Sequence, residues 1–290
     1  MSITVSRLSP KFGAKVTGVD ISVPLEFQTF REIRAAFDEY SILIFPDQTL
    51  DDETQIAFSE RFGLCEPTRS ANPAAGTVFA RQSNLDIETG EVIPPDDRRI
   101  FYQKANYLWH SDSTFKETLS LCSILSAREV PPEGGATEFA STRAAYDSLS
   151  DAEQEEFQSL EVEHDFNYSR RLVGFKFTEE EAAPFPSVQH QFVRTNAGNG
   201  RKSVLIGAHA KCIIGWEEEK SRAKLDELMA RAAQPENTLR HEWRTGDVII
   251  WDNQAAMHRA TPYDAAKYRR LMQRTTISSK GAWPEFEVAR

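Results

Sequence analysis

Cysteine is scarce in this chain of 290 residues. The three residues Cys65, Cys122 and Cys212 are odd in number and form no Cys-x-x-Cys or Cys/His pair. The sequence therefore favours neither a disulfide framework nor a zinc site, and it fits a reducing cytosol. Long hydrophobic runs are also absent, since no apolar stretch approaches the ~18 residues that suggest a membrane span. With no apolar core of the signal-peptide kind near its start, we expect a cytoplasmic protein without a membrane partner.

Positive charge is the minority charge. The chain has 34 Lys and Arg against 44 Asp and Glu, a net charge of -10. This balance disfavours nucleic acid and anionic lipid surfaces as partners, so any anionic ligand needs a local basic pocket. No repeat, low-complexity tract or Pro/Gly/Ser-rich linker divides the chain. We therefore expect one domain over residues 1–290, long enough to bury a substantial core.

The hydrophobic pattern predicts a mostly β fold with helical insertions. Residues 27–40 and 51–63 have helical apolar spacing, and a short buried strand is expected at 41–45. From about residue 76, short β-rich runs alternate with turn residues, which is typical of an antiparallel double-stranded β-helix, or jelly roll. Helical insertions are expected at about 141–160 and 216–233.

Two other segments have features of functional elements. Residues 86–105 are long, charged and contain two adjacent prolines, which predicts either a lid or a solvated excursion. The glycine-containing turn at 196–202 lacks the spacing of a phosphate-binding loop and is interpreted as a hairpin connection.

The segment LWHSDSTF contains two candidate metal ligands, His110 and Asp112. On a strand, side chains two residues apart share a face, so both could reach one ion. The pair alone occurs by chance in many proteins. A third ligand is available in His258, which follows a hydrophobic strand and a turn. Two histidines and one carboxylate form the facial triad of non-haem Fe(II) oxygenases, which leaves adjacent positions open for a bidentate 2-oxo acid and O2.

The other four histidines are weaker candidates. His164, His190 and His241 have no partner at metal-ligand spacing and are interpreted as structural. His209 follows a strand and a glycine, so it could face the site or lie in the core.

Five segments, in this order, resemble one known family: WHSDSTF, PPEGGATEFASTRAAYDSL, RTNAGNGRKSVLIGAHA, GDVIIWDNQAAMHRATPYD and RRLMQRTTI. They are similar to the taurine dioxygenase and 2,4-dichlorophenoxyacetate dioxygenase family of Fe(II)/2-oxoglutarate-dependent dioxygenases. The resemblance spans nearly the whole chain. It implies a jelly-roll oxidoreductase that uses iron, 2-oxoglutarate and O2, with family members commonly forming homo-oligomers.

The resemblance also implies roles for particular residues. Thr137 and Arg270 would hold the distal carboxylate of 2-oxoglutarate, a role that suits a hydroxyl donor and a planar guanidinium. Arg269 also falls within the family spacing, but the alignment of the terminal strand selects Arg270. Arg274 would bind the anionic head of the substrate, because it lies four residues further along the same strand face. The remaining substrate-contact candidates are Asn106, His209, Phe115 and Trp251. Phe115 and Trp251 could form a cavity wall or equally belong to the core.

By resemblance, the reaction couples oxidation of 2-oxoglutarate to succinate and CO2 with hydroxylation of a small anionic substrate. The segments are more similar to the phenoxyacetate-cleaving branch, which implies attack on the carbon next to the ether oxygen of an aryloxyalkanoate. A taurine or alkylsulfonate dioxygenase is the second hypothesis. A sensor that only binds metal and 2-oxoglutarate, and a zinc hydrolase with the same ligands, are more distant alternatives.

Overall fold

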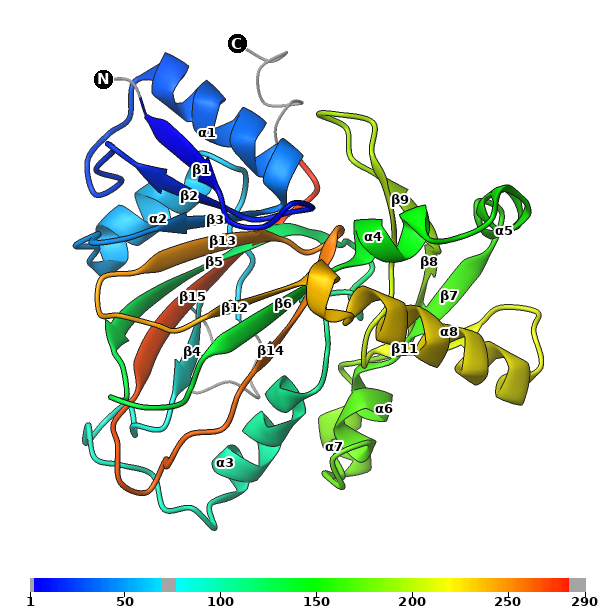
Figure 1. Cartoon of the computed structure of the whole chain (residues 1–290). Helices are drawn as coiled ribbons and strands as arrows, with labels where there is room; N and C mark the ends of the chain where they lie inside the picture. Colours follow the sequence, from blue (N-terminus) through cyan, green and yellow to red (C-terminus); the bar gives the residue numbers. More distant parts are fainter. Residues whose placement is uncertain (1–2, 69–76, 282–290) are drawn as a thin grey trace.

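A seven-stranded sheet runs through the computed structural model, which describes residues 3–68 and 77–281. Its strand order is β1, β2, β3, β13, β5, β15 and β4 (Figure 1). Their bounds are β1 Thr4–Arg7, β2 Ala14–Thr17, β3 Ile42–Phe45, β4 Phe79–Ser83, β5 Ser120–Glu129, β13 Val248–Asp252 and β15 Leu271–Ser278. Strands β3 and β13 are buried throughout, as expected for continuous aliphatic runs covered on both faces.

A smaller antiparallel sheet completes the roll. It has the order β12, β6 and β14, with bounds β12 Thr238–His241, β6 Thr137–Ser141 and β14 Ala256–Ala260. Phe139 of this sheet belongs to one buried cluster with Leu125, Trp251 and Met272 of the larger sheet. The apolar faces of the two sheets therefore pack on each other, and the structure confirms the predicted jelly roll.

Helices α1 (Phe27–Tyr40) and α2 (Asp52–Glu60) lie beside the larger sheet (Figure 1). Phe30 and Phe37 of α1 and Phe58 of α2 join a second buried cluster with aliphatic residues of the sheet. Asp51 caps α2 by accepting a hydrogen bond from the Thr54 amide at 2.8 Å. Both helices fall where the apolar spacing predicted them.

The chain between β6 and β12 forms a helical and β insertion beside the roll (Figure 1). Its elements are β7 Glu161–His164, β8 Val188–Gln191, β9 Val193–Thr195, β10 Lys202–Val204, β11 Ala210–Ile213, α4 Thr142–Asp147, α5 Asp151–Phe157, α6 Phe166–Arg171, α7 Glu179–Ala182, α8 Glu218–Ala232 and the 3-10 helix η2 Pro235–Asn237. The predicted insertion at 141–160 is two helices, because Ser150 caps a new helix through the Glu153 amide. The other predicted insertion corresponds to α8, and strands β9 and β10 flank the predicted hairpin turn.

The segment 86–105 contains regular secondary structure. Its first part closes an antiparallel bridge between Leu85 and Val92, and its second part contains α3 (Arg98–Gln103) and the start of the 3-10 helix η1 (Lys104–Tyr107). Asp97 starts α3 by accepting a hydrogen bond from the Arg99 amide at 2.7 Å. The segment is therefore not one continuous loop, and its role as a lid stays a prediction.

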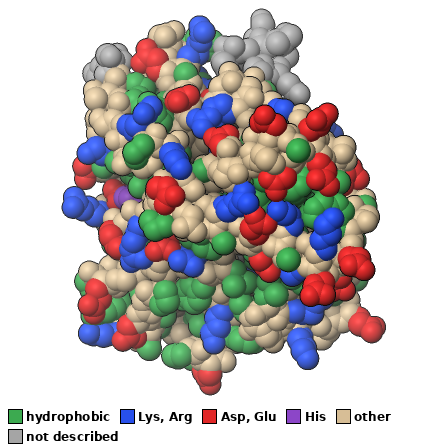
Figure 2. All heavy atoms as spheres, turned by 45° about the vertical axis from the view of Figure 1, so that its right-hand side comes forward, with side chains coloured by type: hydrophobic (Ala, Val, Ile, Leu, Met, Phe, Trp, Pro, Cys, Tyr) green, Lys and Arg blue, Asp and Glu red, His purple; other side chains and the backbone are tan. Residues whose placement is uncertain are grey.

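The surface mixes charges of both signs. On the face drawn in Figure 2, acidic and basic side chains are interspersed, and hydrophobic side chains form a band across its lower part. Among the helices of the described ranges, none is long and apolar enough to cross a membrane.

Candidate metal centre and its cavity

The two candidate histidines face each other across a β-bridge. The His110 amide donates to the His258 carbonyl at 3.0 Å, and the His258 amide donates to the His110 carbonyl at 2.8 Å. His258 lies on β14, whereas His110 follows η1 and Asp112 begins a turn in which Ser113 has a positive φ of 58°. The sequence predicted a strand for the whole His-x-Asp motif; only His110 has β pairing, because the chain turns at Asp112.

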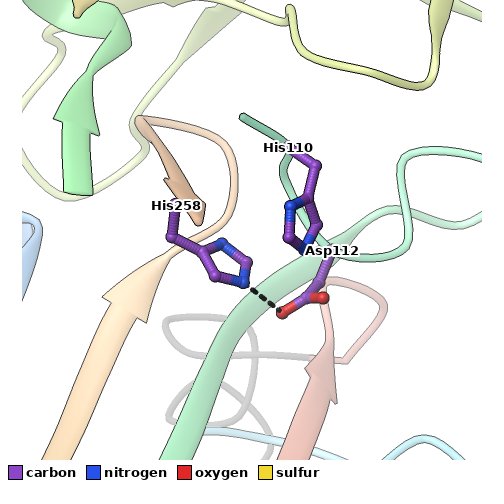
Figure 3. A group of neighbouring side chains, drawn as sticks. All are labelled: His110, Asp112 and His258. Atoms are coloured by element: carbon purple, nitrogen blue, oxygen red, sulfur yellow. Dashed lines mark ion pairs between the residues drawn. The ribbon is translucent and has the colours of Figure 1, made fainter. Parts of the chain in front are cut away.

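The side chains of His110, Asp112 and His258 converge on one point (Figure 3). One ligand atom from each lies within 4.8 Å of the other two, and all three residues are buried. His258 Nε2 lies 3.8 Å from Asp112 Oδ2. Two imidazole nitrogens and one carboxylate oxygen at this separation form a donor set that suits Fe(II) and similar ions.

The protonation of both histidines also suits metal binding. His110 Nδ1 lies 2.7 Å from the Leu108 carbonyl, which can only accept, so Nδ1 holds the proton and Nε2 keeps a free lone pair. Burial lowers the pKa of His110, and it lowers the pKa of His258 well below its usual value. Both rings are therefore neutral near pH 7, which is the form that binds a metal.

Asp112 is held as an ionised carboxylate. Burial alone would raise its pKa, but the charge of Arg274 and a hydrogen bond from Ser123 keep the pKa well below the usual value. Ser123 Oγ donates to Asp112 Oδ2 at 2.7 Å, and Arg274 donates to Asp112 Oδ1 at 2.6 Å. Asn253 Nδ2 in turn donates to Ser123 Oγ at 2.9 Å. This chain of donors fixes the direction of the carboxylate.

The two predicted 2-oxoglutarate anchors occupy buried positions at the start of their strands. Thr137 begins β6 and accepts a hydrogen bond at 2.9 Å from Trp243 Nε1. Arg270 precedes β15 and is 8% exposed, and its Nε has no hydrogen-bond partner. Arg269, the other arginine considered, lies at the surface and pairs with Glu129 at 2.9 Å. Of the two arginines, Arg270 is the one with an unused buried donor.

Tyr263 lies next to Arg270 and next to the two glycines that precede Thr137. Its ring lies 5.9 Å from the Arg270 guanidinium. Gly134 and Gly135 pack against the same residue with φ of 73° and 68°. A Cβ on Gly134 would lie 2.8 Å from the Pro262 carbonyl, so only glycine allows this approach next to Thr137.

A cavity of about 610 Å³ opens at the metal ligands His110 and Asp112. Four of the predicted substrate-contact residues line it: Asn106, Phe115, His209 and Arg274. His209 is buried, with its ring 6.1 Å from the His110 ring and 4.9 Å from the Phe115 ring. Of the two interpretations left open for His209, the structure favours the position facing the cavity.

Of the two positions that the sequence allows for Trp251, a cavity wall or the core, Trp251 occupies the core. It is 1% exposed and belongs to the core cluster between the two sheets. Its ring lies 4.6 Å from the His258 ring and 5.7 Å from the Phe139 ring. Because Trp251 points inward from a fully buried strand, it supports His258 from the core side.

The sequence interpretation missed most of the aromatic wall of the cavity. The additional rings are Tyr102, Phe166, Phe175, Phe177 and Phe185. Neighbouring rings are in contact, with Phe115 and Phe166 at 4.4 Å and Phe166 and Phe185 at 4.7 Å. The density of phenylalanine between residues 166 and 185 was the available signal, but the course of that segment could not be placed. The sequence also gave no course for the loop at residues 64–76, of which 69–76 lie outside the described residues.

The fold and this site define a jelly-roll metalloenzyme whose facial triad opens onto an aromatic cavity. The chain belongs to the family described as "Taurine catabolism dioxygenase TauD, TfdA family", whose model matches residues 4–276. Family membership and the relatives described next confirm the predicted family and the predicted enzyme class, a 2-oxoglutarate-dependent dioxygenase.

Two characterised relatives and one solved structure show the similarity. The chain is 38% identical over 287 residues to an alpha-ketoglutarate-dependent 2,4-dichlorophenoxyacetate dioxygenase of Cupriavidus pinatubonensis, covering 96% of this chain and 98% of the relative. It is 34% identical over 285 residues to an (S)-phenoxypropionate/alpha-ketoglutarate-dioxygenase of Sphingobium herbicidovorans, covering 96% of each. The crystal structure of AAD-2 in complex with Mn(II) and N-oxalylglycine superposes with a TM-score of 0.89 at 37% identity, covering 97% and 98% of the chains.

Proposed function

We propose that this protein binds Fe(II) through His110, Asp112 and His258, and 2-oxoglutarate through Thr137 and Arg270. The observation that supports the metal site is the convergence of two neutral imidazoles and one ionised carboxylate at the end of a cavity. The unpartnered Arg270 Nε is a buried donor that a carboxylate would satisfy. The iron would supply the activation of O2, with 2-oxoglutarate as the two-electron reductant.

The proposed substrate is an aryloxyalkanoate. The aromatic wall suits a flat aryl ring, and Arg274 offers a cation for the carboxylate. The relatives named for 2,4-dichlorophenoxyacetate and (S)-phenoxypropionate support the same class. One oxygen atom of O2 enters the C–H bond next to the ether oxygen, and the other enters succinate. The resulting hemiacetal or hemiketal collapses to a phenol and a 2-oxo acid or glyoxylate.

The protein contributes positioning and exclusion of water. Arg274 on β15 and Asn106 on η1 lie at the cavity wall beside the metal ligands, where they can fix the substrate carboxylate. Asn106 is itself oriented by Gln82, to which its Nδ2 donates at 2.9 Å. Phe115 and the other rings shield the reacting carbon from solvent.

We also propose that α3, within the predicted lid segment 86–105, closes the cavity against α7. Arg98 of α3 pairs with Glu181 of α7 at 2.6 Å, and Tyr102 packs on Phe175 with ring centroids 5.5 Å apart. The pair is largely exposed, so it can open without a large cost.

Three broader predictions remain proposals: a single domain over residues 1–290, a homo-oligomer and a cytoplasmic location. The first is supported by the family match over residues 4–276. Size-exclusion chromatography with light scattering tests the second, and cell fractionation tests the third.

The experiment combines binding and turnover. Anaerobic Fe(II) protein is mixed with 2-oxoglutarate, and the weak visible charge-transfer band of the complex is recorded. O2-dependent release of succinate and phenol is then measured with phenoxyacetate, both phenoxypropionate enantiomers and taurine. The expected result is a band and phenol from at least one aryloxy acid. Turnover of taurine alone would reassign the enzyme to sulfonates, and absence of the band would contradict the proposed metal and co-substrate site.

A further inference from the structure

One buried cation of the cavity has no role in the function proposed above. Arg170 lies on α6, lines the cavity and is 8% exposed. Its guanidinium lies 4.3 Å from the centroid of the Phe166 ring and 4.7 Å from that of the Tyr102 ring. Its Nη1 donates to Ser169 Oγ at 3.2 Å, and its Nε has no partner. Arg170 takes part in none of the ion pairs found among the described residues.

Four other cations of the cavity differ in this respect, whereas Arg81, which is only half-buried, also has no ion pair among the described residues and an unpartnered Nε. Arg98 pairs with Glu181 at 2.6 Å, and Lys116 contacts Glu66. Arg99 pairs with Asp86 and Asp97, and Arg274 pairs with Asp112. A buried cation without a carboxylate is costly, and contacts with aromatic rings offset only part of that cost. An anionic ligand would supply the missing charge.

Arg170 lines the same cavity as the metal ligands His110 and Asp112. The ring of His209, another residue of the cavity wall, lies 6.1 Å from the His110 ring. The ring of Phe166, which packs on Arg170, lies 5.8 Å from the His209 ring.

We infer that Arg170 is a second anion-binding residue of this cavity, and that it holds the carboxylate of the aryloxyalkanoate from the α6 side while Arg274 approaches from β15. This inference rests on the proposed function. Two flanking rings restrict the rotation of the guanidinium, so its donors are oriented before the substrate binds. Arg274 already donates to Asp112. A second cation therefore lets the substrate carboxylate be fixed without withdrawing Arg274 from the metal ligand.

The alternative is that Arg170 only packs between the rings. A pair of ligands separates the two: phenoxyacetate, and 2-phenoxyethanol, which has the same ring and ether oxygen but no charge. Binding of each is measured without O2 to the Fe(II) and 2-oxoglutarate complex, from the change in its visible absorbance. The variants are Arg170→Met, which keeps the apolar stem, and Arg170→Lys, which keeps the charge. Arg99→Met is the control, because it removes a cavity cation that already has carboxylate partners.

We expect Arg170→Met to weaken phenoxyacetate about 10- to 100-fold, the loss typical of a charge-assisted hydrogen bond, and to leave phenoxyethanol within about 3-fold. Arg170→Lys should recover part of the loss, and Arg99→Met should retain wild-type binding of both ligands. Equal weakening of both ligands by Arg170→Met would overturn the inference, and so would a matching loss of 2-oxoglutarate affinity. Failure of the wild type to bind phenoxyacetate would instead contradict the proposed function, and this inference with it.

Discussion

Replacing Ser123 with alanine tests whether the hydrogen bonds behind Asp112 prepare the metal site. Ser123 Oγ donates to Asp112 Oδ2 at 2.7 Å in a fully buried setting. A hydrogen bond to a charged group contributes about 1.5–3 kcal/mol. Arg274 still holds the other carboxylate oxygen, so we expect the lower end of this range. The dissociation constant for Fe(II) should then rise about 10-fold, the low end of what loss of a residue behind a metal ligand costs.

The assay is anaerobic Fe(II) titration of the metal-free protein, with Ser126→Ala as the matched control. Ser126 lies on the same strand, is equally buried and donates to Gln55 Oε1 at 2.7 Å. It points to the opposite face, because it is three residues from Ser123. Each variant loses a hydrogen bond that the serine donates and one that it accepts, from Asn253 for Ser123 and from Arg128 for Ser126, but only Ser123→Ala should weaken Fe(II). Unchanged Fe(II) affinity in Ser123→Ala, or an equal loss in both variants, would refute the reasoning.

Three other predictions concern the co-substrate, the substrate and the core. Arg270→Lys should raise the 2-oxoglutarate dissociation constant about 10- to 100-fold by removing the planar fork, whereas Arg269→Lys should not change it; isothermal titration calorimetry distinguishes them. Arg274→Met should weaken phenoxyacetate and, through Asp112, also Fe(II), while 2-oxoglutarate affinity measured at saturating Fe(II) stays near wild type. Burial lowers the pKa of His164 from 6.5 to about 3. Below about pH 6.5 the unfolded chain therefore binds a proton that the folded chain does not, so the free energy of unfolding decreases as the pH is lowered. Between pH 7.5 and 5.5 this loss amounts to about 1.4 kcal/mol, and urea unfolding of His164→Leu without metal should lack that part of the loss.

Periodic and local signals in the sequence predicted much of the fold. Helix α1 has an apolar stripe at helical spacing, and α2 has the capping Asp51, so both could be located before the structure. The broken β-rich runs predicted the roll. The turn at Asp112 was not predicted, because it depends on contacts between distant segments such as the bridge of His110 to His258.

In the candidate site, too, local signals identified some residues, whereas others depend on the packing of distant segments. His110, Asp112 and His258 could be selected by residue type and spacing, and the structure brings them together. Trp251 could not be placed, because an aromatic residue on a buried strand can face either the cavity or the core, and only sheet packing decides. Arg170 gave no signal, because the inference about it depends on its having no ion pair among the described residues, which is a property of three-dimensional structure.

The most direct test of the account is the charge-transfer band of the Fe(II) and 2-oxoglutarate complex, compared between the wild type and His258→Ala without O2. We predict a band for the wild type that His258→Ala lacks, together with loss of tight Fe(II) binding by the variant. A band of wild-type intensity and Fe(II) affinity in His258→Ala would contradict the triad.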